Sequence, residues 1–346
     1  MELLIPCAGK STRFPTERPK YLLTMPDGKL MIQYTTESLL PEFDRVLFAI
    51  LREHDEKFHS STILKKLFPK CEILILEEVT KGQAETVTKM LEYFDVKSSF
   101  LVKDADAYFE ISSSYESNKN YISLCNAKKL PNAKLYNKSF ADISDQNYIL
   151  RTSLDIISNY FSCGGYFFSE PVAFVENYKQ YEKMQIDGEF FISNIIDVMI
   201  DEGHIFHPME CTNYEDLGTY EVWKEYRKTK SSYFFDLDGV VYENGSEFWK
   251  PKWGENKIFN EAKEKINDLY NSGNQIILVT SRSEEFRDIT VKQLKQDGLQ
   301  YHKLIMGIFH GTRYLVNDYS KSNPFPTAKA INTKRDSCDF VEQIDI

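Results

Sequence analysis

Residues 4–14 read Leu-Ile-Pro-Cys-Ala-Gly-Lys-Ser-Thr-Arg-Phe, a short apolar run that leads into a loop of small and basic residues. Gly9 allows the backbone to approach a ligand closely, and successive N–H groups in such a loop can surround an anion. Arg13 adds a forked cation, and Lys20 adds a point charge after Pro19. The stretch therefore predicts a buried strand followed by a phosphate-binding loop built from Ala8, Gly9 and Lys10.

The residues that follow alternate between apolar runs and amphipathic patterns. Such a succession of strands and helices predicts a largely parallel sheet that is covered by helices on both faces. Polar clusters interrupt the strand-like pieces between Tyr121 and Phe168, so we expect an inserted antiparallel region and a mixed sheet there. The predicted strands are 3–6, 46–51, 73–76 and 100–102, and the predicted helices are 31–40, 60–68, 83–94, 189–200 and 219–228.

The same alternation starts again after a polar, charged break at 227–231. We predict strands at 233–237, 275–279 and 314–316 and helices at 259–270 and 284–296. A length of 346 residues suits two domains better than one. The expected division is therefore a first domain at residues 1–230 and a smaller α/β domain at residues 231–346.

Composition excludes several classes of function. The net charge of −10 argues against a protein that binds nucleic acid or an anionic membrane surface, since both need positive charge. No apolar run approaches the ~18 residues of a membrane span. The six cysteines form no Cys-x-x-Cys pair, which favours reduced thiols and a cytoplasmic location over a disulfide framework.

Four motifs in the first domain resemble those of one family. Gly-x-x-x-Arg-Phe followed by Pro19-Lys20, the turn Thr80–Thr86, the strand end Phe100–Asp106 and the late segment Asp216–Thr219 are similar to the signature of the GT-A-like nucleotidyltransferases. These enzymes make activated sugars and alcohols on a Rossmann-like GT-A fold. The resemblance implies that a nucleoside triphosphate and a small phosphorylated acceptor are the substrates, and that Gly82 and Gln83 contact the base.

The chemistry of that reaction explains the residue types. A phosphate oxygen of the acceptor attacks the α-phosphorus of the triphosphate and expels pyrophosphate, so two anions must be brought together. Mg²⁺ takes hard oxygen ligands and usually only one or two carboxylates. We expect Asp106 and Asp216 to hold this ion, with Asp104 as a further candidate. The catalytic cations would be Arg13 and Lys20.

The acceptor site is less specifically marked. The resemblance implies that Gly165, in the run Cys163–Tyr166, and Glu189 contact the phosphorylated acceptor. It also implies one more lysine near the α-phosphate. Four candidates remain open for it, namely Lys128, Lys129, Lys134 and Lys138.

The second domain begins with Phe-Phe-Asp-Leu-Asp-Gly-Val-Val at residues 234–241, which places two carboxylates at the end of an apolar strand. This resembles motif I of the haloacid dehalogenase (HAD) superfamily. The resemblance implies that Asp236 is a covalent nucleophile, Asp238 a general acid and base, and both part of a magnesium site. Downstream, Thr280 would bind a phosphoryl oxygen, Asp318 would complete the metal site, and Lys303, or else Lys321, would be the family's lysine.

The spacing leaves no room for a cap domain between these motifs, so the resemblance is to capless members. We expect a bifunctional enzyme of capsule or surface polysaccharide biosynthesis that transfers a nucleotidyl group, with CTP slightly preferred, and hydrolyses a phosphomonoester. Two alternatives remain. The first domain could be a GT-A glycosyltransferase, although the loop at Gly9–Arg13 argues against it, and the second could be a non-catalytic regulatory or assembly module.

Overall fold

The computed structural model describes residues 1–10, 14, 18–130, 135, 138–184, 188–245, 251–318 and 328–344. The chain divides into two compact units, Met1–Arg227 and Lys228–Ile346. The sequence-based boundary at Lys230 lies close to this division. Each unit has its own sheet and its own apolar core. Among the residues that the structure describes, no helix is both long enough and apolar enough to span a bilayer.

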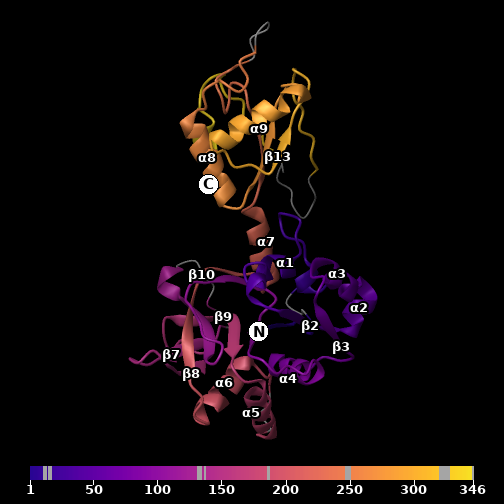
Figure 1. Ribbon diagram of the computed structural model, residues 1–346, viewed down its shortest axis with the longest axis vertical. Coiled ribbons are helices and arrows are strands. Elements are labelled where there is room, and N and C mark those ends of the chain that lie inside the picture. The colour runs from indigo at the N-terminus through magenta and orange to yellow at the C-terminus, as the bar shows by residue number, and fades with distance from the viewer. Residues whose placement is uncertain are drawn as a thin grey trace. The chain divides into compact units, whose positions relative to one another are not determined.

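The first unit is built on one mixed sheet (Figure 1). Its strand order is β3-β2-β1-β4-β9-β6-β10-β5, with the β7–β8 hairpin attached through β9. The strands β1 to β4 are parallel, whereas β9 runs antiparallel to β4 and β6, and β10 runs antiparallel to β5. The strands are β1 (Glu2–Pro6), β2 (Arg45–Leu51), β3 (Glu72–Leu76), β4 (Phe100–Lys103), β5 (Ala107–Ile111), β6 (Asn120–Asn126), β7 (Phe140–Ile143), β8 (Ile149–Ser153), β9 (Tyr160–Phe168) and β10 (Phe206–Asp216).

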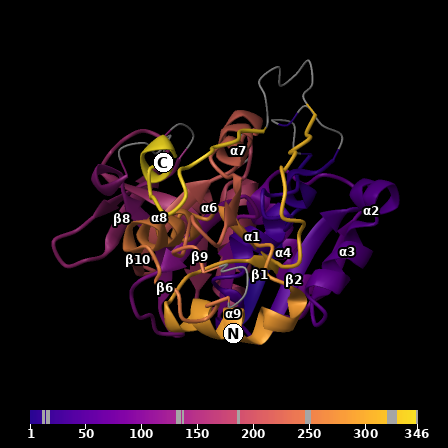
Figure 2. The ribbon, with the colours of Figure 1, turned by 90° about the horizontal axis from the view of Figure 1, so that it is seen from above.

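Helices cover both faces of this sheet because side chains alternate along each strand. In β1, Leu4 belongs to a cluster with α4, α5 and α6, while Leu3 and Ile5 belong to a cluster with α1 and α3. Figure 1 shows α5 and α6 side by side, and Figure 2 shows α2 and α3 beside β2. The helices are α1 (Met31–Thr36), α2 (Arg52–Phe58), α3 (Ser60–Leu67), α4 (Gln83–Tyr93), α5 (Pro171–Lys183), α6 (Ile192–Asp201) and α7 (Tyr220–Lys228).

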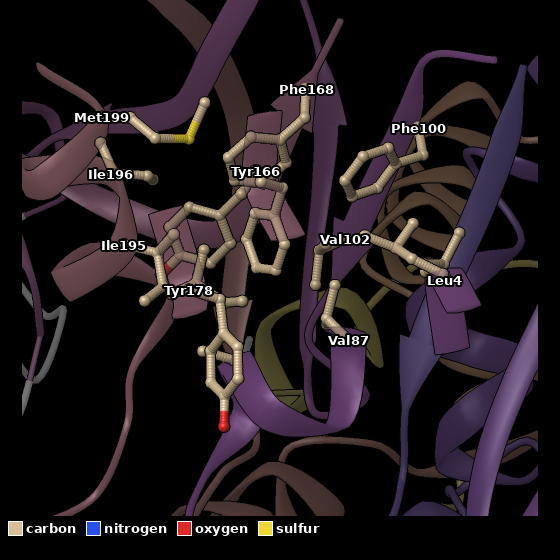
Figure 3. Packing of buried hydrophobic residues seen from close by; sticks show 14 of the residues in the cluster. Leu4, Val87, Phe100, Val102, Tyr166, Phe168, Tyr178, Ile195, Ile196 and Met199 are labelled. Atoms are coloured by element: carbon tan, nitrogen blue, oxygen red, sulfur yellow. The ribbon is translucent and has the colours of Figure 1, made fainter. Parts of the chain in front are cut away.

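On the α4–α5–α6 face, a group of aromatic rings packs within the core (Figure 3). The rings of Phe100 and Phe168 stack with centroids 5.2 Å apart, and Phe174 meets Phe168 edge to face at 4.9 Å. Ile195 and Ile196 of α6 are fully buried against them. This packing anchors β4 and β9, the two central strands whose ends contribute to the site described below.

The second unit has a three-stranded parallel sheet among its described residues, in the order β11-β12-β13. The strands are β11 (Ser232–Asp236), β12 (Gln275–Val279) and β13 (Lys303–Ile305). They are accompanied by α8 (Asn260–Asn271), the short 3₁₀ turn Glu284–Phe286 and α9 (Arg287–Gln296). Because the three strands are parallel, their carboxyl ends, at Asp236, Val279 and Ile305, lie at one edge of the sheet.

Two predicted elements differ in the structure. The strand expected at 314–316 is wrong, since this segment pairs with no strand, and Tyr314 and Val316 are 87% and 91% exposed. Its three consecutive apolar residues suit a buried strand, but the third strand is formed by Lys303–Ile305 instead. The helix expected over 31–40 ends at Thr36, ahead of Pro41, whose ring cannot continue a helix.

Candidate functional site

The carboxylates of the first unit meet at the ends of β4 and β10. Asp104 and Asp106 follow β4 directly, and Asp216 is the last residue of β10, where it pairs in register with Ala107 of β5. Leu217 N–H donates to the Asp106 carbonyl at 2.8 Å. The antiparallel pairing of β5 with β10 therefore brings Asp106 and Asp216 together from positions far apart in the chain.

Gly218 shows how close the two carboxylates lie. A methyl group added to Gly218 would be 2.8 Å from Asp106 Oδ2 and 2.9 Å from Asp216 Oδ1. Gly218 N–H also donates to Asp216 Oδ1 at 2.8 Å, which orients that carboxylate. The position thus admits only a glycine without displacing one of the two side chains.

Two lysines pair with these carboxylates. Lys20 Nζ binds Asp106 Oδ2, and Lys138 Nζ binds Asp216 Oδ2 at 2.6 Å. Lys138 also lies over the Tyr214 ring, 5.3 Å from its centroid. Of the four lysines that the sequence could not rank, Lys138 is the one found beside the carboxylates. Lys129 instead pairs with Glu210 at the surface, and Lys134 lies outside the described residues.

Asp104 faces a different neighbour. Its Oδ1 accepts a hydrogen bond from Gln83 Nε2 at 2.5 Å, so the turn before α4 is tied to the end of β4. Burial, and then the nearby Asp106 carboxylate, raise the pKa of Asp104. Lys103, fully buried beneath the loop, donates to the carbonyls of Asp104 and Ala107, and burial lowers its pKa to about 8. Gln83 is therefore held by the acidic loop.

The other predicted contacts surround the same edge of the sheet. Gly82 precedes α4, and Phe190 binds this turn through hydrogen bonds with the backbones of Lys81 and Ala84. The exposed Glu189 is next to Phe190 and so lies near the turn. Gly165 of β9 has a different environment, because its N–H donates to the buried Ser123 hydroxyl at 2.9 Å. Its contacts are those of a residue packed within the sheet.

The phosphate loop is only partly described. Ala8 is buried at the end of β1, and Gly9 and Lys10 are exposed. Residues 11–13 and 15–17 lie outside the described residues, and with them the predicted catalytic Arg13. Lys20, in the turn Lys20–Leu22, is the predicted cation of this region that the structure places at the carboxylates.

In the second unit, Asp236 and Thr280 lie at the carboxyl edge of the sheet. Asp236 ends β11 in register with Val279, the residue before Thr280. Gly239 has a φ of +87°, which allows the chain to turn away after the Asp-x-Asp pair. Thr280 is fully buried, and its hydroxyl lies 3.3 Å from Asp238 Oδ2. The predicted nucleophile, acid and hydroxyl are thus neighbours.

The predicted lysine of this site is not brought to Asp236. Lys303 begins β13 in register with Ile277, away from the carboxyl edge, and its side chain is exposed. Arg313 instead pairs with Asp236, its Nη1 lying 3.0 Å from Asp236 Oδ2. Asp318 is exposed in the segment that forms no strand, so its expected position at a strand end is wrong. Lys321 lies outside the described residues.

Two arginines that pair with the predicted carboxylates of the second unit, Arg282 and Arg313, were not predicted from the sequence. Arg282, two residues after Thr280, forms a pair with Asp238, its Nε and Nη2 donating to the two carboxylate oxygens at 2.8 Å each. Arg313 is far from Asp236 in the chain, and no spacing rule connects them. For Arg282 a signal existed, because a charged residue directly after a buried strand in a Thr-x-Arg run lies at the ligand-binding edge of a parallel sheet.

The pair Asp106 and Asp216 fits a magnesium ion. Both are carboxylates that converge on one point beside Gly218, and both are balanced by lysine side chains. Two carboxylates are the number that Mg²⁺ usually takes from a protein when phosphate and water complete its shell. In the second unit, Asp236 ends β11 at the carboxyl edge and pairs with Arg313, while both oxygens of Asp238 are engaged by Arg282.

Different known proteins match different parts of the chain. Residues 223–327 match the family model of the HAD superfamily, subfamily IIIB (acid phosphatase). No curated protein matches the chain.

Solved structures similar to the first unit include the nucleoside-diphosphate-sugar pyrophosphorylase from Vibrio cholerae RC9, with a TM-score of 0.57 and 22% identity over 65% of this chain and 99% of that one. The inositol-1-phosphate CTP transferase from T. maritima has a TM-score of 0.53 and 14% identity, with 66% and 96% covered. A UDP-glucose pyrophosphorylase complexed with UDP-glucose has a TM-score of 0.50 and 17% identity, with 66% and 98% covered.

These matches confirm the two-part prediction of fold. The first unit has the fold of known nucleotidyltransferases, and it is followed by a domain that matches the acid phosphatases of the HAD superfamily.

Proposed function

We propose that the first unit transfers a nucleotidyl group from a nucleoside triphosphate to a phosphorylated sugar or polyol and releases pyrophosphate. The observation that carries this proposal is the convergence of Asp106 and Asp216 at Gly218, with Lys20 and Lys138 paired to them. A site with carboxylates for a metal ion and lysines for phosphate, and no nucleophilic side chain among these groups, suits transfer between two anions.

The side chains have separate roles in this proposal. Lys20 and Lys138 supply fixed positive charge where phosphate groups arrive, and Arg13 would add a third cation. A magnesium ion held by Asp106 and Asp216 would act as a Lewis acid on phosphate oxygens. Gln83, held by Asp104, would contact the base, and Glu189 would contact the acceptor.

We take CTP as the first nucleotide to test, and a sugar or polyol phosphate of surface polysaccharide synthesis as the first acceptor. A cytoplasmic setting suits both, since triphosphates are available there and the six cysteines are free. The neighbours that guide the choice include a CTP transferase and a UDP-glucose pyrophosphorylase, so fold alone favours no base.

The test is a matrix of nucleoside triphosphates against sugar and polyol phosphates in the presence of Mg²⁺, with pyrophosphate release as the readout. We expect one triphosphate and one acceptor class to give release that requires both. Pyrophosphate release from no combination, in a protein that is folded by circular dichroism, would contradict the proposed transfer.

The proposal for the second unit is hydrolysis of a phosphomonoester through an aspartyl-phosphate on Asp236. Its support is the position of Asp236 at the carboxyl edge beside Arg313, together with the family match. Arg313 would balance the charge of the nucleophile and of the incoming phosphate, and Thr280 would bind a phosphoryl oxygen. Beryllium fluoride, which mimics the aspartyl-phosphate, should inhibit wild-type hydrolysis, and hydrolysis that is insensitive to it would contradict a covalent route.

A further inference from the structure

Arg282 is a charged side chain that is completely buried. Its Nε donates to Asp238 Oδ2 and its Nη2 to Asp238 Oδ1, both at 2.8 Å, so the planar guanidinium grips the carboxylate through two parallel hydrogen bonds. Asp238 itself retains 12% of its side-chain exposure. The pair therefore joins the interior of the unit to the edge of the sheet where Asp236 ends β11.

The surroundings keep the guanidinium in one orientation. Its Nη1 lies 3.3 Å from Thr290 Oγ1 and 3.4 Å from Gln293 Oε1, both on α9. The rings of Tyr242 and Trp253 lie 5.8 and 5.9 Å from its central carbon. Because every nitrogen of the group has a partner, rotating it away would leave a buried charge without compensation.

A gain in folding stability does not explain well why Arg282 forms a buried ion pair with Asp238. Replacing a buried ion pair with apolar side chains of similar volume is often neutral or stabilising, since the charges must first be removed from water. The alternative explanation is geometric. Two hydrogen bonds fix the plane of the Asp238 carboxylate, and the Thr280 hydroxyl at 3.3 Å from Oδ2 adds a third constraint.

We propose that Arg282 is a positioning residue for phosphomonoester hydrolysis, acting through Asp238. This inference rests on the phosphatase function proposed above. An Asp236 oxygen attacks phosphorus while the bond to the leaving oxygen breaks, and the leaving oxygen takes its proton from Asp238. Water then attacks the aspartyl-phosphate and gives a proton to Asp238. The phosphorus bond to Asp236 breaks, its electron pair returns to the carboxylate, and inorganic phosphate leaves.

Two substrates with different leaving groups distinguish whether Arg282 positions the general acid or only stabilises the fold. p-Nitrophenolate leaves readily as an anion, whereas an alkoxide must be protonated as it leaves. General acid catalysis contributes roughly 10²–10⁴-fold where the proton is needed. The comparison uses kcat/KM, which includes steps only up to the aspartyl-phosphate.

The experiment measures hydrolysis of both substrates by the 346-residue chain with Mg²⁺. In Arg282→Met we expect kcat/KM for an alkyl phosphomonoester to fall by about 10²-fold or more, and for p-nitrophenyl phosphate by less than about tenfold. Arg287→Met is the matched control, because Arg287 forms an exposed pair with Glu284 and should leave both values unchanged. Equal losses for the two substrates would overturn the proposal.

Two further variants keep the test decisive if Arg282→Met folds poorly. Arg282→Lys keeps the charge but lacks the forked geometry, so it should show the same leaving-group discrimination to a smaller degree. In the Asp238→Asn background, Arg282→Lys should have little additional effect on either substrate. An additional loss there would show that Arg282 does not act through Asp238. If the wild-type protein hydrolyses neither substrate, the phosphatase function itself fails, and this outcome is distinct from the others.

Discussion

Paired opposite charges characterise the first site at the level of single residues. Asp106 is bound by Lys20, and Asp216 is bound by Lys138 at 2.6 Å. In the proposed transfer, such pairs would keep carboxylates and cations in place before the phosphates arrive, which would lower the reorganisation needed when substrates bind. Each member of the pairs should therefore matter more to transfer than to stability.

Lys138 provides the first prediction. Replacing Lys138 with Met should lower kcat/KM for nucleotidyl transfer by roughly 10²-fold, since one preorganised cation is lost. The matched control is Lys129→Met, because the Lys129–Glu210 pair lies exposed at the surface. Pyrophosphate release measures the effect, and similar activity in the two variants would show that Lys138 has no role in transfer.

The second prediction concerns Gly218. A Gly218→Ala side chain would come within 3 Å of both carboxylates, at 2.8 Å from Asp106 Oδ2 and 2.9 Å from Asp216 Oδ1, and so displace one of them. We expect transfer to fall by about 10²-fold and to require more Mg²⁺, because displacements of this size disrupt a reacting geometry. A Mg²⁺ titration of activity tests this, and an unchanged titration curve would mean that the two aspartates do not share a metal ion.

His54 gives a prediction for pH. It is buried in α2, its Nδ1 has no hydrogen-bond partner among the described residues, and burial lowers its pKa. The unfolded chain therefore binds a proton at His54 more tightly than the folded chain does. The contribution of neutral His54 to the free energy of unfolding is fully present above about pH 6.5 and is lost as the pH falls below that value. His54→Leu should reduce the loss of unfolding free energy between pH 7 and pH 5, measured with denaturant. An identical loss in both proteins would refute this.

The acidic residues that the structure brings together are more clearly marked in the sequence than the cations beside them. Asp106 stands in a short motif after the apolar run 100–102, and Asp216 begins the short motif Asp216–Thr219, so both are marked by local sequence without knowledge of the fold. Lys138 stands in a stretch with several other lysines, and only the pairing of strands places it beside Asp216. Arg313 could not be predicted from sequence either, because its contact with Asp236 depends on the path of an irregular segment.

At the level of elements, the alternation of side chains along β1 determines which helices cover each face. Leu4 points to the α4–α5–α6 cluster, and Leu3 and Ile5 to the opposite one. The strand β2, a continuous apolar run, and the helices α4 and α9 could be predicted because pattern and burial agree. The segment 314–316 carries a strand-like pattern, yet it is exposed, so a pattern alone cannot say whether a strand finds a neighbour to pair with.

The core under β4 and β9 supports a prediction about stability. Ile195 of α6 is fully buried in this cluster (Figure 3). Truncation of Ile195 to Ala should lower the free energy of unfolding of the first unit by about 2–5 kcal/mol, through lost burial and a residual cavity. Ile156→Ala is the control, since Ile156 is 72% exposed. Denaturant titration measures both, and equal effects would contradict the assigned packing.

At the level of the whole molecule, the chain contains two units with separate sheets and separate apolar cores. The first gathers Asp106 and Asp216 at Gly218, and the second gathers Asp236, Asp238 and Thr280 at the edge of its own sheet. The restart of the strand and helix pattern near residue 231 predicts two domains, because each sheet needs its own apolar strands. The central claim is that these are two independent catalytic sites.

The most direct test measures both activities in two variants of the 346-residue chain, Asp216→Asn and Asp236→Asn, with Mg²⁺ present. We predict that Asp216→Asn loses pyrophosphate release and keeps phosphomonoester hydrolysis, because a neutral amide is a poorer ligand for a hard cation. Asp236→Asn should lose hydrolysis and keep transfer, because an amide cannot attack phosphorus. Loss of both activities in each folded variant, or loss of neither, would contradict the account of two independent sites.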